Sequence, residues 1–299
     1  MKKEITVEFS IEKLNIKEFL ESYCTLSSRK AKQLLKQKKI QINNKTAYYD
    51  SNVKSGDMVV FDLSEAGKDS TLPESMALDI IYEDEYFLAV NKPAGLLVHP
   101  TPNFPANTLA NGIKFYFLSK DLDIPIRFIN RIDRDTSGLV IIAKSGEVHR
   151  DLAKQFELDS CEKLYLAVAE GFFAAANGTI DKPIGIDDEN AIRRAISEDG
   201  QKSITMYEVQ EQYNMAALIK LKLITGRTHQ IRVHLSSMGH PLVGDKLYGG
   251  SMQYMQRQAL HAYKMIFTHP YGKGVIKLQA KLPPDMEQLL ALLRNKEIE

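Results

Sequence analysis

The segment NRIDRDTSGLVIIAKS, residues 130–145, passes from charged residues into a continuous apolar run. The run that begins after Ser137 predicts a strand buried on both faces, because a strand with one wet face alternates apolar and polar residues. Outward from this segment, the chain consists of many short predicted strands and a few helices, without regular βαβ alternation. These features predict an α+β fold rather than a doubly wound sheet.

Two aspartates, Asp133 and Asp135, precede this strand, with an arginine shortly before each. The charges could pair with one another on the surface, where each pair stabilises little. The letters DRDTS also approach the D-x-D-x-T pattern of phosphatases that use an aspartate nucleophile and bind Mg²⁺ with carboxylates. A polar pair interrupts the apolar run before the aspartates and the arginines would repel a cation, which disfavours a metal site. A nucleophilic aspartate without a metal is the third interpretation.

The composition indicates a folded protein that is neither secreted nor membrane-bound. With 44% hydrophobic and 26% charged residues, the chain can form a normal hydrophobic core. Its net charge of +1 does not indicate a particular class of binding partner. No run approaches the ~18 apolar residues of a membrane span, and the start lacks the apolar core of a signal peptide. We therefore expect a cytoplasmic protein in which Cys24 and Cys161 are reduced.

A polar stretch at residues 64–78, SEAGKDSTLPESMAL, predicts a linker between two domains, 1–70 and 71–299. In the first domain a helix begins near Ser27 or Ser28, and a strand, an Asn-Asn turn and a second strand follow it. Seven basic residues and no acidic one lie between Arg29 and Lys45. Such a helix could simply be a solvated surface, but clustered lysine and arginine side chains also suit phosphate contacts. The predicted RNA-binding residues are Arg29, Lys30, Lys32, Lys36, Lys38 and Lys39.

The basic helix, the hairpin and the closing SGDMVVF resemble the small RNA-binding domain named after a ribosomal small-subunit protein, the S-four-like domain. Residues 79–290 resemble the RluA-type pseudouridine synthases, which usually carry H-R-L-D-x-x-T-S-G before an apolar strand. The matching segments, in the family's order, are NKPAGLLVHP (91–100), NRIDRDTSGLVIIAK (130–144), EKLYLAVAEG (162–171), TGRTHQIRVHLSSMGHPLVGDKLYGG (225–250) and RQALHAYKMIFTHP (257–270). The resemblance implies a mixed, mostly antiparallel central sheet flanked by helices.

The resemblance implies an isomerase that detaches uracil from ribose and reattaches it through carbon 5. The reaction gains and loses no atoms and changes no oxidation state, so neither a cofactor nor a metal is expected. Asp133 is the implied nucleophile, and Asp135 falls at a variable position with a structural role. Arg227, in GRTHQIR, is the implied cation that keeps the carboxylate ionised, and Tyr165 is the implied active-site tyrosine that stacks on uracil or relays its proton.

Three further residues are implied to contact the substrate or its neighbours. Lys163 would orient the cluster through ion pairing, Arg131 would fill the gap left by a flipped base, and Ile231 would pack against that base. Asn130 replaces the usual histidine of the family; we expect it to support the shape of the loop. The spacing of His229, His234 and His240 fits no zinc motif, which favours hydrogen-bonding roles in the fold.

Two other functions remain open at this point. One is an RNA-binding protein that keeps the fold without the activity, and the other is the metal-dependent phosphatase. The preferred hypothesis is an RNA pseudouridine synthase that acts as a monomer on structured RNA. The basic first domain favours large-subunit ribosomal RNA as the substrate, with transfer RNA as the alternative.

Overall fold

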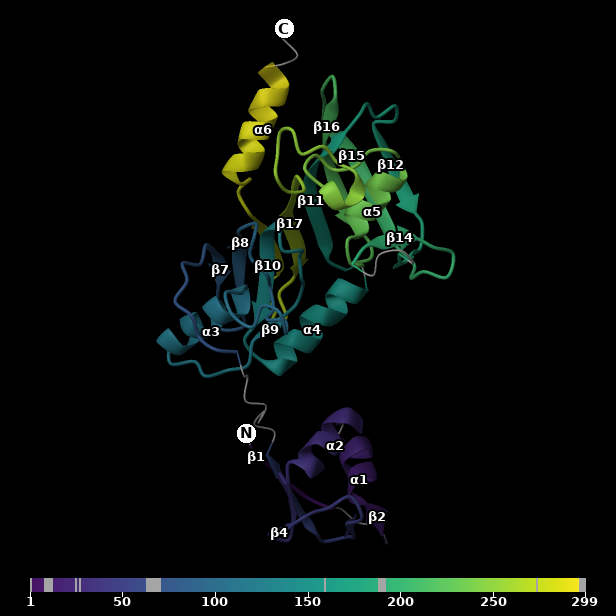
Figure 1. The fold of residues 1–299 in the computed structure, drawn as a ribbon. Coiled ribbons are helices and arrows are strands. Elements are labelled where there is room, and N and C mark those ends of the chain that lie inside the picture. Colours follow the sequence, from purple (N-terminus) through teal and green to yellow (C-terminus); the bar gives the residue numbers. More distant parts are fainter. Residues whose placement is uncertain are drawn as a thin grey trace. The chain divides into compact units, whose positions relative to one another are not determined.

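The computed structural model describes residues 2–7, 13–24, 26, 28–62, 71–158, 160–187, 192–272 and 274–295. The chain forms two compact units, Met1–Lys68 and Asp69–Glu299 (Figure 1). No helix within the described residues has the length and apolar character needed to cross a bilayer.

The smaller unit packs two helices against a four-stranded antiparallel sheet of order β1-β6-β3-β4. Helix α1 buries Phe19 in the core of this unit, and α2 buries Ala31, Leu34 and Leu35, whose spacing in the sequence is typical of one face of a helix. The turn between β3 and β4 holds Asn43 and Asn44 at φ 50° and 66°, as a two-residue hairpin requires. The elements are β1 (Lys2–Thr6), β2 (Leu14–Asn15), α1 (Ile16–Ser22), α2 (Ser28–Lys36), β3 (Ile40–Ile42), β4 (Lys45–Thr46), β5 (Asn52–Val53) and β6 (Met58–Asp62).

The larger unit is built on one ten-stranded sheet. Its main order is β12-β15-β16-β11-β17-β10-β8-β7, while β9 pairs with β10 and β18 pairs with β17. The strands are β7 (Ile80–Glu83), β8 (Phe87–Lys92), β9 (Arg127–Phe128), β10 (Ser137–Ala143), β11 (Glu162–Glu170), β12 (Asn177–Asp181), β15 (Ile204–Gln212), β16 (Ala216–Leu223), β17 (Leu260–Thr268) and β18 (Val275–Gln279). Among these strands β10 and β17 run parallel, and the other pairs are antiparallel. The expected mixed, mostly antiparallel α+β fold is confirmed.

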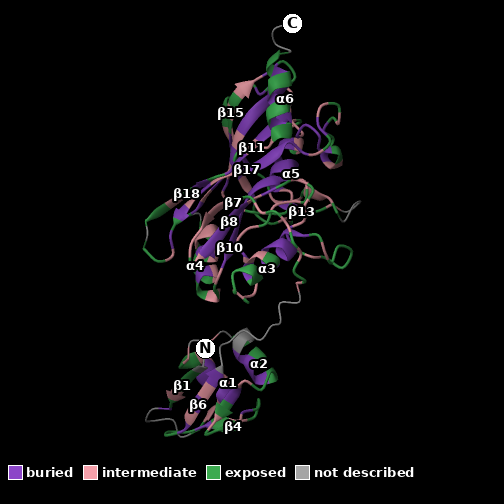
Figure 2. Ribbon diagram, turned by 90° about the vertical axis from the view of Figure 1, so that its left-hand side faces the viewer, coloured by how far each residue is buried: buried purple, intermediate pink, exposed green. Residues whose placement is uncertain are grey.

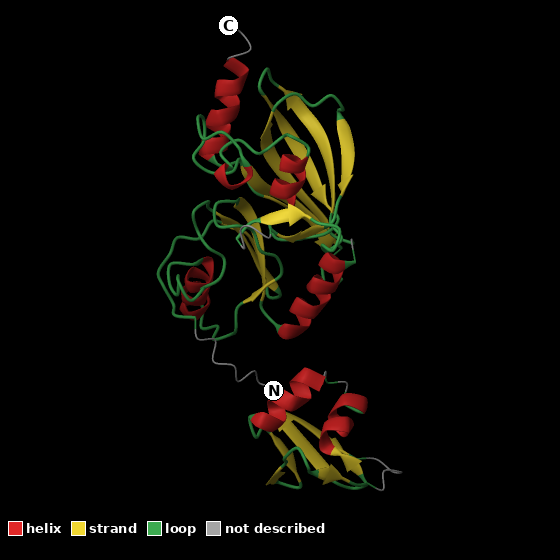
Figure 3. Cartoon of the chain, turned by 45° about the vertical axis from the view of Figure 1, so that its right-hand side comes forward, coloured by secondary structure: helices red, strands yellow, loops and turns green. Residues whose placement is uncertain are grey.

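Helices cover both faces of this sheet (Figure 3). Alternate residues of β8 and β10 pack on α3 (Leu109–Ser119) and, on the opposite face, on α4 (Gly146–Glu157). In the same way, β11 and β16 lie between α5 (Gln230–Ser237) and α6 (Pro284–Asn295). Buried residues are accordingly concentrated in the central strands (Figure 2). All seven residues of β10 are buried, which explains its continuous apolar run.

Two smaller elements of the larger unit pack against α5. A two-stranded ladder pairs β13 (Ile184–Ile186) with β14 (Arg194–Ile196), and η1 (Lys246–Tyr248) is a short 3₁₀ turn. Both contact α5. They thereby bring residues that are distant in sequence to the start of that helix.

The parallel contact between β10 and β17 depends on Gly138. This glycine has φ 116°, and a Cβ atom at this position would lie 2.3 Å from the carbonyl oxygen of Ala262 and 2.6 Å from its nitrogen. Both atoms belong to a backbone that is fixed by the sheet, so they have little room to move. The glycine of the DRDTSG turn therefore serves the close approach of two strands.

Replacing Gly138 with alanine is expected to lower the free energy of unfolding by on the order of 3 kcal/mol, from the clash and the unfavourable φ together. Urea denaturation of the purified protein measures this change. Gly95→Ala is a matched control, because Gly95 also has positive φ but no atom lies within 4 Å of the position that an added Cβ would take. A change at Gly138 no larger than the change at Gly95 would contradict the steric argument.

Candidate active site

The turn that carries Asp133 lies between β9 and β10 and is held by the side chain of Asn130. The Asn130 amide nitrogen donates to the carbonyl of Leu139 at 2.9 Å, and its oxygen accepts from the backbone nitrogen of Ile141 at 2.9 Å. Both partners belong to β10. Asn130 thus fastens the start of the turn to the strand, in agreement with the expected role in loop shape.

Three side chains from other elements fasten the rest of this turn. Lys92 Nζ, at the end of β8, donates to the carbonyl of Arg134 at 2.9 Å. Arg257 Nη1 donates to the carbonyl of Asp135 at 3.0 Å, and Gln258 Nε2 donates to the hydroxyl of Thr136 at 3.2 Å. Burial lowers the pKa of Lys92 to about 7, against the opposing effect of the nearby Asp135 charge. The backbone around Asp133 is therefore fixed before any substrate arrives.

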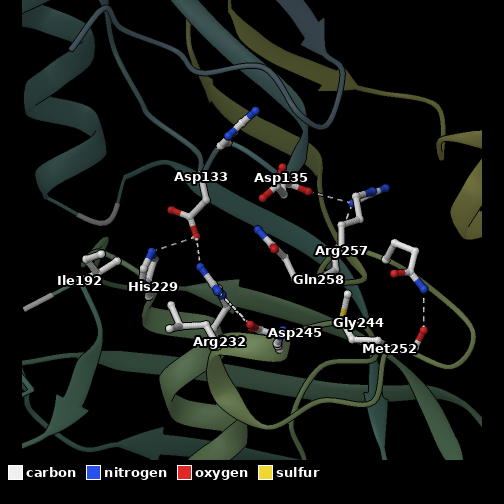
Figure 4. A pocket seen from close by; sticks show the side chains of 14 residues that line it. Asp133, Asp135, Ile192, His229, Arg232, Gly244, Asp245, Met252, Arg257 and Gln258 are labelled. Carbon is white, nitrogen blue, oxygen red and sulfur yellow. Dashed lines mark hydrogen bonds and ion pairs between the residues drawn. The ribbon is translucent and has the colours of Figure 1, made fainter. Parts of the chain in front are cut away.

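Arg232 is the cation beside Asp133. Its Nη1 lies 3.1 Å from Asp133 Oδ2, while its Nε and Nη2 form a bidentate pair with Asp245 at 2.7 and 2.8 Å (Figure 4). The Arg232 and Asp245 side chains are 8% and 1% exposed, against 28% for Asp133. Burial by itself would lower the pKa of Arg232, but its bonds to Asp245 and Asp133 outweigh burial and raise it. A permanently charged, rigidly held guanidinium therefore faces the one carboxylate of this group that is open to solvent.

The position of Arg227 differs from the sequence-based expectation that it would be this cation. Arg227 is exposed, and its Nε donates to the carbonyl of Lys202 at 3.3 Å. The buried side chain of Gln230 accepts from the Arg227 backbone nitrogen and donates to the carbonyl of Ile204. Gln230 thereby fixes the loop before α5. Arg232, inside the helix, lines the pocket and contacts Asp133, and Arg227 is not among the residues that line this pocket.

Tyr165, Lys163 and Ile231 lie at the sheet and helix that border the site. Tyr165 is 7% exposed and shares a core cluster with Ile231, which is 4% exposed. Burial, and then the negative charge of Asp133, raise the pKa of Tyr165, so its hydroxyl keeps its proton at neutral pH. Lys163 Nζ donates to the carbonyl of Phe156 at 3.0 Å, and its ion pairing with the Asp133 cluster stays a prediction.

A pocket of about 360 Å³ opens beside Asp133. Its lining includes Asp135, His229, Arg232, Arg257 and Gln258, which converge from the Asp133 turn, α5 and the segment before β17 (Figure 4). Arg131, two residues before Asp133, is exposed. No group of three or more potential metal ligands occurs among the residues that the structure describes. At Asp133 the pocket presents a partly exposed carboxylate that is held by the buried Arg232.

The three histidines make hydrogen bonds in the fold, as expected. His234 bonds through both ring nitrogens, to the Thr205 hydroxyl and the Lys182 carbonyl, and His240 Nδ1 bonds to the Glu170 carbonyl. His229 Nδ1 bonds to the hydroxyl of Tyr248 at 2.9 Å. Sequence reasoning did not place His229 in the pocket, where its Nε2 lies 3.8 Å from Asp133 Oδ2.

In the smaller unit, the predicted RNA-binding lysines reach solvent. Lys32 and Lys36 of α2 are exposed, as is Lys38 in the turn that follows, and Lys39 is half-buried. The side chains of Arg29 and Lys30 lie outside the described residues. The described lysines therefore form an open basic surface on this unit.

A family model described as RNA pseudouridylate synthase matches residues 86–237, which include β8, the Asp133 turn, β11 and α5. The chain belongs to this family. It is 41% identical over 252 residues to "Uncharacterized RNA pseudouridine synthase YhcT" of Bacillus subtilis, covering 84% of this chain and 83% of that protein. It is 36% identical over 258 residues to "Ribosomal large subunit pseudouridine synthase D" of Pseudomonas aeruginosa, covering 81% and 80%. This RNA pseudouridine synthase is thus of the RluA type, as its motifs indicate.

Solved structures support the fold of the pseudouridine synthase. "Human RNA Pseudouridylate Synthase Domain Containing 1" aligns with a TM-score of 0.58 and 26% identity, covering 74% of this chain and 97% of that one. "Human RNA Pseudouridylate Synthase Domain Containing 4" aligns with a TM-score of 0.60 at 24% identity, covering 72% and 92%. The expected enzyme class, an isomerase acting on RNA, is confirmed by the family and its relatives.

Proposed function

We propose that this synthase converts uridine to pseudouridine with Asp133 as the nucleophile and without a cofactor. The observation that carries the proposal is the Asp133 carboxylate, open to the pocket and held through one oxygen by the buried Arg232. A carboxylate attacks carbon through one of its oxygens, and the adjacent guanidinium fixes the other oxygen of Asp133 in place. The second aspartate, Asp135, contributes a backbone carbonyl to the bond with Arg257.

The proposed reaction balances without an external reactant. A carboxylate oxygen of Asp133 forms a bond to ribose C1′ while the C1′–N1 bond breaks and its electron pair leaves with uracil. After the base rotates, C5 attacks C1′ and the bond to Asp133 breaks, which restores the carboxylate. The proton on C5 is then removed and N1 is protonated. Oxidation states at the start and the end are the same.

Other residues of the site are proposed to hold the uridine outside its helix. Extruding a base costs a few kcal/mol, which contacts in the pocket must offset. Arg131 would fill the vacated space, and Tyr165, whose hydroxyl is protonated, would stack on the base and hand protons between C5 and solvent. Ile231 would support the base from the same core cluster, and Lys163 would hold the start of β11 through its bond to Phe156.

The proposed substrate is large-subunit ribosomal RNA. The relatives from Pseudomonas aeruginosa, Zymomonas mobilis and Nitrosomonas europaea are named ribosomal large subunit pseudouridine synthase D. The smaller unit, proposed to be an S-four-like domain, adds the exposed lysines of α2 for phosphate contacts. Such a substrate places the enzyme in the cytoplasm, and we propose that it acts there as a monomer.

Mapping of pseudouridine across all stable RNAs tests the substrate. Cells with the gene intact, deleted, or carrying Asp133→Ala are compared at nucleotide resolution. We expect one or more positions of large-subunit ribosomal RNA to lose pseudouridine in both the deletion and the Asp133→Ala strain. Loss of pseudouridine only from transfer RNA would contradict the proposed substrate. Loss of pseudouridine in the deletion strain but not in the Asp133→Ala strain would contradict the proposed role of Asp133.

The exposed lysines of α2 are expected to set the salt dependence of RNA binding. Lys32→Ala with Lys36→Ala should weaken binding and reduce the slope of log K against log salt by about 1 for each phosphate that is no longer neutralised. Filter binding to a ribosomal RNA fragment between low and moderate salt measures the slope. Lys54→Ala, at an exposed turn of the same unit, should leave the slope unchanged. If all variants had the same slope of log K against log salt, the proposal that α2 contacts RNA would be wrong.

A further inference from the structure

His229 lies between the loop that carries Arg227 and the first residue of α5, and its backbone conformation is unusual. It is the residue before the first turn of the helix and has φ 57°. Residues other than glycine adopt this left-handed backbone conformation only occasionally. This conformation turns the ring back toward the pocket, with Nε2 3.8 Å from Asp133 Oδ2 and Nδ1 2.9 Å from the Tyr248 hydroxyl (Figure 4 shows the Asp133 side). The ring therefore connects the proposed nucleophile to η1.

The hydrogen bonds of Tyr248 decide which nitrogen of His229 carries the proton. The backbone nitrogen of Arg194 donates to the Tyr248 hydroxyl oxygen at 2.9 Å. The hydroxyl has one hydrogen, and among the described residues His229 Nδ1 is the partner that can accept it. If Nδ1 carried the proton instead, the hydroxyl hydrogen of Tyr248 would have no acceptor among the described residues. The lone pair of Nε2 would then face the negatively charged Asp133 carboxylate. Burial lowers the pKa of His229, which favours the neutral ring. The network thus assigns the proton to Nε2.

Tyr248 also contacts the cation of the site. The Arg232 guanidinium lies 4.8 Å from the centre of the Tyr248 ring. The Tyr248 carbonyl accepts from the Ser236 hydroxyl at 2.9 Å, and its backbone nitrogen donates to the carbonyl of Asp245 at 3.0 Å. One fixed tyrosine therefore supports both groups, Arg232 and His229, that face Asp133.

Arg232 and His229 converge on the same carboxylate oxygen, Oδ2 of Asp133. The other oxygen, Oδ1, makes no hydrogen bond or ion pair with the described residues. We propose that His229, with its Nε2–H tautomer fixed by Tyr248, is a positioning residue that holds Oδ2 together with Arg232 and leaves Oδ1 to attack ribose C1′. The separation of 3.8 Å is longer than a hydrogen bond, and such contacts commonly shorten when substrate closes the site. The inference rests on the proposed role of Asp133.

The kinetic test removes the Tyr248 hydroxyl and leaves its ring beneath Arg232. Tyr248→Phe is expected to lower kcat on the order of tenfold with little change in KM, because it acts on the orientation of the nucleophile rather than on RNA binding. His229→Asn, whose side chain tolerates the left-handed conformation, should reduce kcat by at least as much. The double variant should equal His229→Asn alone, since the hydroxyl acts through the ring. Additive effects of the two substitutions would overturn the inference.

A spectroscopic measurement separates this inference from the proposed chemistry. Nitrogen-15 NMR of the full-length enzyme, with the His229 signals identified by their absence in His229→Asn, should show protonation at Nε2, and a tautomer mixture in Tyr248→Phe. Protonation at Nδ1 would overturn the inference whether or not Asp133 is the nucleophile. Tyr213→Phe is the matched control: it removes another tyrosine hydroxyl, bonded to Glu211 at 2.7 Å outside the pocket, and should change neither kcat nor the His229 signals.

Discussion

Asp133→Asn is expected to abolish pseudouridine formation, with kcat lowered by about 10⁴-fold or more, as for other nucleophiles of covalent catalysis. An amide oxygen is a far weaker nucleophile than a carboxylate and cannot form the bond to C1′. The fold should persist, because Arg232 keeps its bidentate bonds to the buried Asp245. Single-turnover assays on a ribosomal RNA fragment, with tritium release from uridine C5 as the readout, measure the decrease.

RNA affinity and thermal unfolding supply the controls for this variant. Both should match the wild type, since the Asp133 side chain lies at the rim of the pocket and is 28% exposed. Asp135→Asn is the matched neighbour: its bond to Arg257 uses the backbone carbonyl, which the substitution leaves in place. Full activity of Asp133→Asn would contradict the proposal that Asp133 is the nucleophile. An equal decrease in the activity of Asp135→Asn would contradict it as well.

Arg232→Met is expected to reduce both activity and stability. Removing the cation leaves Asp245 buried without its partner, which typically costs about 3–5 kcal/mol of unfolding free energy. It also removes the fixed positive charge at Asp133 Oδ2, for which a decrease in kcat/KM on the order of 10²–10³ is expected. Urea denaturation and single-turnover assays measure the two effects on the same preparation.

Two further variants separate the effects of Arg232. Adding Asp245→Leu to Arg232→Met removes the orphaned carboxylate, so stability should recover while activity should not. Arg227→Met, which changes the exposed arginine of the same motif, should alter stability by less than about 0.5 kcal/mol and leave the chemical step intact. If Arg227→Met reduced activity as much as Arg232→Met, the assignment of the cation from the structure would be wrong.

The sequence predicts most of the fold and part of the site for identifiable reasons. The apolar run of β10, the Asn-Asn turn and the spacing of α2 each follow from local periodicity or turn chemistry. Motifs in a fixed order along the chain predict Asp133 as the nucleophile, which the Asp133→Asn variant tests. The expected role of Asn130 in loop shape agrees with the two hydrogen bonds of its amide. These predictions depend on short stretches of chain, in which local preferences and tertiary structure agree.

The sequence GRTHQIR does not show which of its two arginines, Arg227 or Arg232, lies beside Asp133. The choice between them depends on the left-handed backbone of His229 and on the four bonds of the buried Gln230 side chain, which together set where α5 begins.

The parallel pairing of β10 with β17 has a consequence for the timing of activity during synthesis. The strand that follows the Asp133 turn pairs Ser137 with His261 and Gly138 with Ala262. Contacts between such distant parts of a chain form late, because the loop between them must close first. Arg257 and Asp245, which fix the turn and the cation, also belong to this late portion. A nascent chain that has exposed Asp133 but not β17 should therefore be inactive, so activity requires synthesis of the chain through β17.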